Sequence, residues 1–200
     1  GAKEIDIQVL TPMRNGILGV NSLNEQLQKY INPPSKEKKE KEIAGRIFRE
    51  GDKVMQIKNN YQLEWEQRSV SGRIFDTGSG IFNGDMGIVT TINNTTNYIE
   101  VVFDDDRYVT YDSKQAEELE LAYSITIHKS QGSEYPIPLV SGVPMLMTRN
   151  LLYTGVTRAK KCVCIVGRKE MFGAMIANED QHKRFSGLKW HMENYYKDEI

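Results

Sequence analysis

The sequence has little cysteine, no long apolar run and no large excess of either charge. Its two cysteines, Cys162 and Cys164, provide neither a disulfide framework nor the spacing of a zinc site, so we expect a cytoplasmic chain in a reducing compartment. No apolar run approaches the roughly 20 residues of a membrane span, and no secretory leader is expected. The net charge of −1 excludes a global basic footprint, so any contact with nucleic acid has to be local.

The cysteines lie in the apolar run CVCIVG. Residues two apart on a strand share a face but are roughly 6.6 Å apart along it, too far for a relaxed disulfide. Because a free cysteine in such a run behaves as a small hydrophobe, we predict both as core residues of a buried strand. Hydrophobic residues make up 39% of the chain, enough for the core of one medium domain with a small insertion.

The outer segments of the chain have an α/β pattern. IDIQVLTPM predicts a strand, and apolar residues then recur at helical spacing from Val20 to Tyr30, with Asn21 or Ser22 as the N-cap. After residue 119, helices are predicted over TRNLLYTGVTRAKK and KEMFGAMIAN, and the tail is weakly helical. Strand, loop and helix form the unit of an α/β layer, so residues 1–45 and 119–200 predict one α/β domain.

Residues 46–118 carry short β signals separated by turn residues, among them DKVMQIKN, IFNGDMGIVTTI and YIEVVFDD. They predict a small inserted barrel of the SH3-like kind. The preceding NPPSKEKKEKEIAGR is interpreted as a mobile solvated link because its charges alternate in sign, and NNYQLEW as a flexible hairpin. We interpret Asp104–Asp106 as a hairpin turn rather than a metal site, and predict no metal ligands.

The aromatic residues of this barrel have two interpretations. They stack the bases of a single nucleic-acid strand, each for roughly 1–3 kcal/mol, or they fill the core of the small barrel. The candidates are Tyr61, Trp65, Phe82 and Tyr98.

The stretch AYSITIHKSQGSEYP, residues 122–136, begins as a strand and then turns abruptly polar. Ligands of open α/β sheets sit at such strand ends. Side-chain donors suited to phosphate oxygens come first, namely Thr126, His128, Lys129 and Ser130. Three further groups follow in the chain. Gln131 supplies an amide, Gly132 a backbone that a ligand can approach closely, and Glu134 a carboxylate suited to ribose hydroxyls. Taken singly, His128 favours a structural, hydrogen-bonded histidine and Lys129 a solvated charge; the combination of donors favours a ligand site.

The segment LLYTGVTRAKK combines an apolar helical face with polar residues that include Arg158. Arg158 comes shortly before a predicted strand, on an element packed against the sheet. An arginine held there can present its fork to an anion at the domain edge, as an arginine finger does in phosphoryl transfer. The alternative is a surface arginine on a core helix.

These residues resemble a known family. ITIHKSQGSEYP looks like motif V, and LLYTGVTRAKK like motif VI, of superfamily 1 DNA helicases. The particular residues of motif V resemble those of the RecD-like branch, which includes TraA-type relaxase helicases. QVLTPMRNGILGVNSLNEQLQ is similar to the entry into domain 2A, the UvrD-like helicase C-terminal domain. FREGDKVMQIKNNY and IFNGDMGIV resemble the start of the inserted 2B barrel. The resemblance follows nearly the whole chain in order.

The resemblance implies a RecA-like motor domain 2A, interrupted by an SH3-like domain 2B. It implies that Arg158 is the catalytic arginine finger, and that it binds ATP together with Gln131, Gly132 and Glu134. It implies that single-stranded DNA contacts Thr126, His128, Lys129 and Ser130, and also the barrel. It further implies 5′ to 3′ movement and a role in DNA repair or recombination.

One half of a nucleotide site is missing from the sequence. No G-x-x-x-x-G-K-[ST] loop occurs, and no Walker B strand ends in paired acids. We therefore expect ATP and Mg²⁺ to be bound mainly by an N-terminal motor domain of a longer chain, and the 200 residues alone to lack ATPase activity. Two alternatives stay open: a stand-alone nucleic-acid-binding module with a helicase-derived fold, and an interaction domain whose barrel grips a protein.

Overall fold

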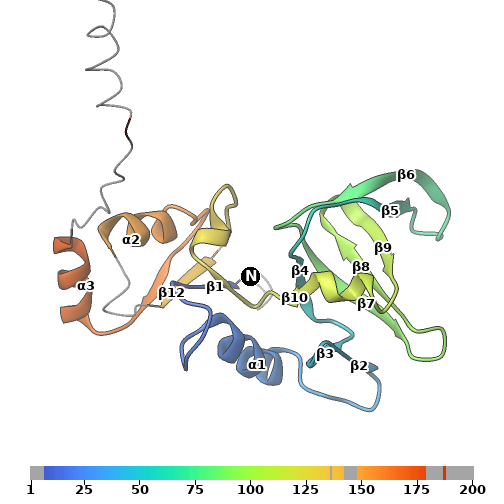
Figure 1. Ribbon diagram of the computed structural model, residues 1–200, viewed down its shortest axis with the longest axis horizontal. Coiled ribbons are helices and arrows are strands. Elements are labelled where there is room, and N and C mark those ends of the chain that lie inside the picture. Colours follow the sequence, from blue (N-terminus) through green and yellow to red (C-terminus); the bar gives the residue numbers. More distant parts are fainter. Residues whose placement is uncertain (1–6, 136, 142–147, 179–186, 188–200) are drawn as a thin grey trace, which may run out of the picture.

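The computed structural model describes residues 7–135, 137–141, 148–178 and 187, and Figure 1 shows two sheet-containing parts side by side. The part on the left holds the parallel sheet and the helices. Its elements are β1 (Ile7–Thr11), α1 (Val20–Ile31), β11 (Ser124–Thr126), β12 (Ile137–Ser141), α2 (Arg149–Val156), β13 (Cys164–Val166) and α3 (Lys169–Ala177). None of the helices in the described ranges is long and apolar enough to cross a membrane. The tail predicted to be weakly helical lies outside the described residues, apart from residue 187.

The sheet of this part has the order β11-β1-β12-β13, and all its neighbouring strands are parallel. Helices α1 and α2 lie on opposite sides of it (Figure 1). The predicted strands and helices are therefore present, although α2 ends at Val156, earlier than predicted. The prediction of two buried cysteines is wrong, because Cys162 and Cys164 are exposed. Strand β13 is the edge of the sheet and is exposed throughout.

Helix α1 buries two amides beside part of its predicted apolar face, since Val20 is buried and Leu27 packs against the barrel core. Tyr30 is 83% exposed, whereas Asn24 and Gln28 are buried. Their amides bond to backbone carbonyls across the fold, as Asn24 Nδ2 does to Leu121 O at 2.8 Å. The predicted cap is also wrong: the N-cap residue is Gly19, and no side chain caps the helix.

The part on the right is an antiparallel sheet of seven strands in the order β10-β4-β7-β8-β9-β5-β6. The strands are β4 (Lys53–Gln56), β5 (Asn60–Arg68), β6 (Ile74–Ile81), β7 (Met86–Asn93), β8 (Tyr98–Phe103), β9 (Arg107–Tyr111) and β10 (Leu119–Leu121). The sheet includes β10, so it extends beyond residue 118. Its curved interior is filled by one continuous cluster of apolar residues, in which Phe48, Ile81, Ile99 and Tyr111 are fully buried. We call this part the barrel.

Two segments predicted to be irregular are ordered strands. The link, residues 32–46, contains β2 (Glu40–Ile43) and leads into β3 (Arg46–Arg49); the two strands form a hairpin whose Ile43 and Phe48 enter the barrel core. The expected flexible hairpin NNYQLEW forms the start of β5, with Leu63 buried. Both predictions fail because alternating polar residues also suit a strand with one wet face. The acidic run 104–106 is confirmed as the turn between β8 and β9.

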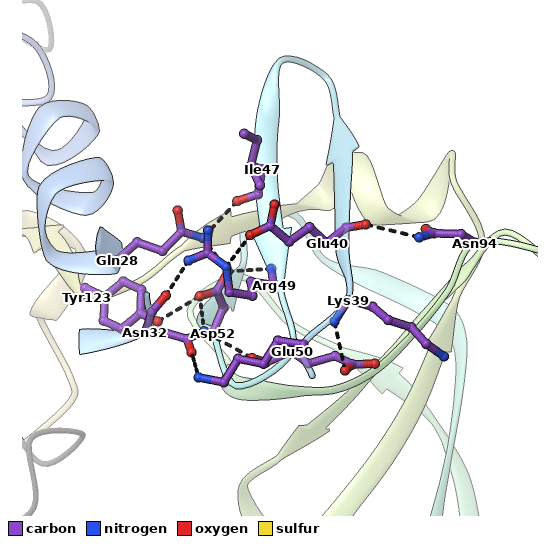
Figure 2. A network of polar contacts seen from close by, with 11 residues as sticks. Gln28, Asn32, Lys39, Glu40, Ile47, Arg49, Glu50, Asp52, Asn94 and Tyr123 are labelled. Atoms are coloured by element: carbon purple, nitrogen blue, oxygen red, sulfur yellow. Dashed lines mark hydrogen bonds and ion pairs between the residues drawn. The ribbon is translucent and has the colours of Figure 1, made fainter. Parts of the chain in front are cut away.

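A buried carboxylate joins the barrel to the parallel-sheet part (Figure 2). Asp52 accepts hydrogen bonds from Gln28 Nε2 at 2.5 Å, Asn32 Nδ2 at 2.7 Å, the Arg49 backbone N–H at 2.7 Å and the Tyr123 hydroxyl at 2.9 Å. Burial raises the pKa of Asp52 above its ordinary value, although these four donors oppose the shift. Because the donors come from α1, β3 and the β10–β11 connection, Asp52 fixes α1 against the barrel.

Candidate functional site

The polar residues of the 122–136 stretch lie at the carboxyl end of two neighbouring parallel strands. Strand β11 pairs with β1 in a register that places Thr126 beside Thr11. The chain leaves both strands at this edge, and the Ile127 N–H donates to Thr11 O at 2.9 Å. The loop after β1 and the loop after β11 are therefore neighbours, as ligand-binding loops of open α/β sheets are.

The loop after β11 is held by its own side chains. Ser130 is fully buried and donates its hydroxyl to Ile127 O at 2.6 Å, so in this structure it stabilises the loop and is not presented to a ligand. Thr126 is half-buried, and its Oγ1 accepts from the Lys129 N–H at 3.2 Å. Gly132 has φ +85° with open space around it, so backbone conformation alone favours glycine there.

His128 and Lys129 lie on the outside of this loop. His128 is exposed. The ammonium of Lys129 is half-buried and lies 4.0 Å from Glu120 Oε2. Burial lowers the pKa of Lys129 from its ordinary value, and Glu120 opposes the shift. Lys129 is thus a cation held in place, with a carboxylate partner that the sequence did not indicate.

The Glu120 carboxylate forms ion pairs with three cationic side chains: Lys129, Arg14 and Arg46. Arg14 forms an ion pair with its Oε1, and Arg46 Nη2 lies 3.1 Å from the same oxygen. Both guanidiniums are about two-fifths exposed, while the Glu120 side chain is 10% exposed. The cluster therefore carries a net positive charge beside Lys129. Sequence reasoning missed it; the available signal was Arg14 in the loop directly after β1.

Arg158 follows α2 and lies against the end of the 122–136 stretch. Its Nη1 donates to Ser133 O at 3.2 Å, its Nε to Thr154 O at 3.2 Å, and its Nη2 to Thr157 Oγ1 at 3.3 Å. The side chain is half-buried. A guanidinium has five N–H groups, so two have no hydrogen-bond partner among the described residues. Arg158 is thus positioned but not enclosed.

The remaining predicted residues, Gln131 and Glu134, lie on the exposed part of the loop after β11, which we call the rim. Gln131 is exposed, and Glu134 forms an ion pair with Lys160 at 3.7 Å in which both side chains are more than half exposed. The backbone joins the two motif segments directly, since Tyr135 N–H donates to Arg158 O and Lys160 N–H donates to Tyr135 O, each at 2.8 Å. The structure thus places Arg158 against Ser133 and Tyr135, the residues on either side of Glu134, and Gln131 and Gly132 come directly before Ser133 in the chain. His128 and Lys129 lie earlier in the same loop.

Two family models match the chain in succession. The model described as the ATP-dependent RecD-like DNA helicase SH3 domain matches residues 23–103. The model described as the UvrD-like helicase C-terminal domain matches residues 121–166. The chain belongs to the RecD-like helicase family. The resemblance seen in the sequence, including the SH3-like barrel, is therefore confirmed.

Curated RecD-like relatives match over most of this chain. The ATP-dependent RecD2 DNA helicase of Deinococcus radiodurans is 35% identical over 158 residues, which cover 77% of this chain and 19% of that protein. The RecBCD enzyme subunit RecD of Mycolicibacterium smegmatis is 30% identical over 185 residues, or 91% of this chain and 28% of that one. The RecD-like chain thus spans between 19% and 28% of the length of these relatives.

Solved structures show the same fold at low sequence identity. Bacteroides Pif1 bound to single-stranded DNA matches with a TM-score of 0.54 and 18% identity, over 96% of this chain and 46% of that chain. Bacteroides Pif1 in complex with ADP-AlF3 and single-stranded DNA matches with a TM-score of 0.51 and 19% identity. The fold of this chain is therefore shared with part of these Pif1 structures.

Proposed function

We propose that this chain is the second motor domain, a RecA-like domain 2A with 2B inserted, of an ATP-dependent RecD-like DNA helicase. The observation that carries the proposal is the junction of the two motif segments. Arg158 bonds to Ser133 through its side chain and to Tyr135 through its backbone, so the arginine is held against the end of the loop after β11. The same loop carries His128 and Lys129.

The rim around Arg158 suits the phosphate and ribose of ATP. Arg158 has two N–H groups directed to no described partner, and a guanidinium fork matches a phosphate oxygen pair. Gln131 and Glu134 are exposed on the same rim and supply an amide and a carboxylate for hydroxyl groups. ATP is the substrate, and its hydrolysis supplies the free energy for movement; Arg158 stabilises charge on the γ-phosphate.

In this proposal the P-loop domain, and not this chain, binds magnesium. The described residues bring together no three carboxylate, cysteine or histidine side chains that could hold a metal ion. The Mg²⁺ that accompanies ATP is therefore assigned to the P-loop domain that the family places before this segment. This division leaves the chain with one wall of a composite nucleotide site and without ATPase activity of its own.

The DNA-facing surface is the outside of the loop after β11. His128 and Lys129 contact the phosphates of a single strand, with Thr126 beside them, and Arg14 extends the positive charge along the same edge. Contacts of this kind hold a strand without reading its sequence. Movement from 5′ to 3′ and a role in repair or recombination are the behaviour proposed from the family.

The test uses the longer polypeptide that includes the P-loop domain. Arg158→Ala should reduce DNA-stimulated ATP turnover by roughly 10³-fold or more and leave binding of a dT oligonucleotide within about twofold. The matched control is Arg168→Ala, since Arg168 is an exposed arginine of the same part. Unchanged turnover in Arg158→Ala would refute the assignment.

The competing function is a nucleic-acid-binding or protein-binding module with no motor. In that case Arg158 is dispensable, and the 200 residues show their full activity alone. If Arg158→Ala lowers turnover and the isolated chain hydrolyses no ATP, the module hypothesis is rejected.

A further inference from the structure

The barrel carries a groove that takes no part in the site described above. Its volume is about 710 Å³ and it opens between β5, β6 and β9. It is lined by Gln62, Leu63, Glu64, Trp65, Glu66, Thr77, Gly78, Ser79, Tyr108, Thr110 and Gln115.

The groove exists because β5 and β9 diverge. The two strands pair at only two positions, Glu66 with Tyr108 and Gln67 with Arg107. Beyond them β5 stays with β6, and β9 continues with β8 as far as Tyr111. The edges of β5 and β9 that face each other across the groove are therefore separated. A strand edge without a partner accepts an added extended chain.

The floor of the groove is an aromatic ring in a fixed position. Trp65 lies opposite Gly78 on β6. A Cβ built at Gly78 would lie 2.3 Å from Trp65 Cζ2, so the indole packs directly on the glycine backbone. Trp65 is half-buried and also packs against the barrel core. A rigid indole that is partly exposed in a groove is a good surface for a cation or an apolar side chain.

The charge of the groove selects against nucleic acid. Its lining has two carboxylates, Glu64 and Glu66, and no lysine or arginine among the described residues that form it. Arg68, at its end, is already neutralised: its Nη2 lies 2.6 Å from both Glu66 and Glu100. The Arg68 guanidinium carbon also lies 4.6 Å from the centre of the Tyr108 ring. Arg68 thus shows that this surface accommodates a cationic side chain. The carboxylates would repel the phosphates of a nucleic acid.

We propose that this groove binds an extended, arginine- or lysine-bearing peptide segment of a partner protein. The segment runs along the free edge of β5. Successive side chains of a strand point to opposite faces, so the cationic side chains of the segment lie on the face of Glu64, and its alternate apolar side chains lie on the face of Trp65. This surface is separate from the nucleotide and DNA residues, and the proposal does not depend on the motor function.

Trp65 provides a direct readout. The chain has two tryptophans, Trp65 and Trp190, so Trp190→Phe leaves Trp65 as the sole indole. The probe is a blocked octapeptide of alternating arginine and valine. The comparison probes are an octapeptide of alternating glutamate and valine and the oligonucleotide dT8. The arginine peptide should change Trp65 emission saturably, and the other two should not.

A matched pair of variants separates the groove from general charge attraction. In the Trp190→Phe background, Glu64→Lys should weaken the arginine peptide by on the order of fivefold, because one attraction becomes one repulsion. Asp76→Lys, the same charge reversal at an exposed residue of β6 outside the groove, should change affinity by less than about twofold. Equal weakening by both variants, a Trp65 response to dT8 or the acidic peptide, or no response to the arginine peptide overturns the proposal.

Discussion

The backbone N–H of Tyr135 donates to the carbonyl oxygen of Arg158 over 2.8 Å, and Tyr135 itself is buried. This bond ties the end of the loop after β11 to the turn that follows α2, two segments separated by more than twenty residues. The two segments are therefore joined directly through their backbones.

The first prediction concerns the surface of the loop after β11. Replacing His128 and Lys129 together by alanine should weaken binding of a dT oligonucleotide, and the slope of log K against log salt should fall by about 0.7 for each phosphate that the protein no longer neutralises. Fluorescence anisotropy between low and moderate salt measures the slope. Lys114→Ala, an exposed lysine of the barrel, is the control. An unchanged affinity at low salt would count against this surface.

The second prediction concerns the carboxylate among three cations. Glu120→Gln should tighten dT binding at low salt by roughly threefold, because it removes the charge that opposes Arg14, Arg46 and Lys129. Glu117→Gln, an exposed glutamate outside this cluster, should change little. A weaker affinity in Glu120→Gln would mean that the carboxylate is needed to orient the cations.

The third prediction uses the raised pKa of Asp52. A carboxyl group whose pKa is raised on folding stabilises the fold fully below its ordinary pKa near 4, and this contribution disappears as the pH rises through the folded-state pKa. Asp52→Asn removes it and leaves buried donors facing an amide, at a cost of about 1–3 kcal/mol. In urea titrations the stability difference between the two proteins should therefore narrow as the pH rises from 4.

A difference that widens over the same pH range would show that the four hydrogen bonds outweigh burial and lower the pKa of Asp52. All other carboxylates are common to both proteins, so their titration cancels in the comparison.

The fourth prediction concerns the contact between Gly78 and Trp65. Gly78→Ala should destabilise the barrel by about 1–3 kcal/mol, because the new methyl group occupies the place of the indole. Urea denaturation measures the destabilisation, and Trp65 emission reports the displaced ring. Gly173→Ala, in α3 with nothing within 4 Å of the added Cβ, should instead be neutral or slightly stabilising. Equal stability of the two variants would contradict the packing.

Several parts of the structure could be predicted from local pattern. The two-residue period before His128 predicted β11, and Gly and Asn punctuation predicted the strands of the barrel and the turn at 104–106. The polar residues that follow β11 lie at a strand end, as expected for a ligand site. Such features depend on neighbours in the chain, so periodicity and turn chemistry are enough to locate them.

Other features were out of reach because their partners are distant in sequence. The burial of Asn24 and Gln28 depends on carbonyls and on Asp52 across the fold, and apolar periodicity is blind to a buried polar face. Likewise, the hairpin 40–49 is ordered because Ile43 and Phe48 enter the barrel core, although its charged residues indicate a solvated link.

The amino-acid sequence by itself determined the family, the α/β character of the outer segments, and the residue types available at the site. These features could be determined because the motif residues and the short-range periodicity are properties of contiguous sequence. Only the tertiary structure decided that Ser130 is buried, that Glu120 gathers Arg14, Arg46 and Lys129, and that Arg158 rests on Ser133. Those outcomes depend on which carbonyl, carboxylate or cation comes to lie within hydrogen-bonding distance, and that distance is set by packing rather than by local sequence.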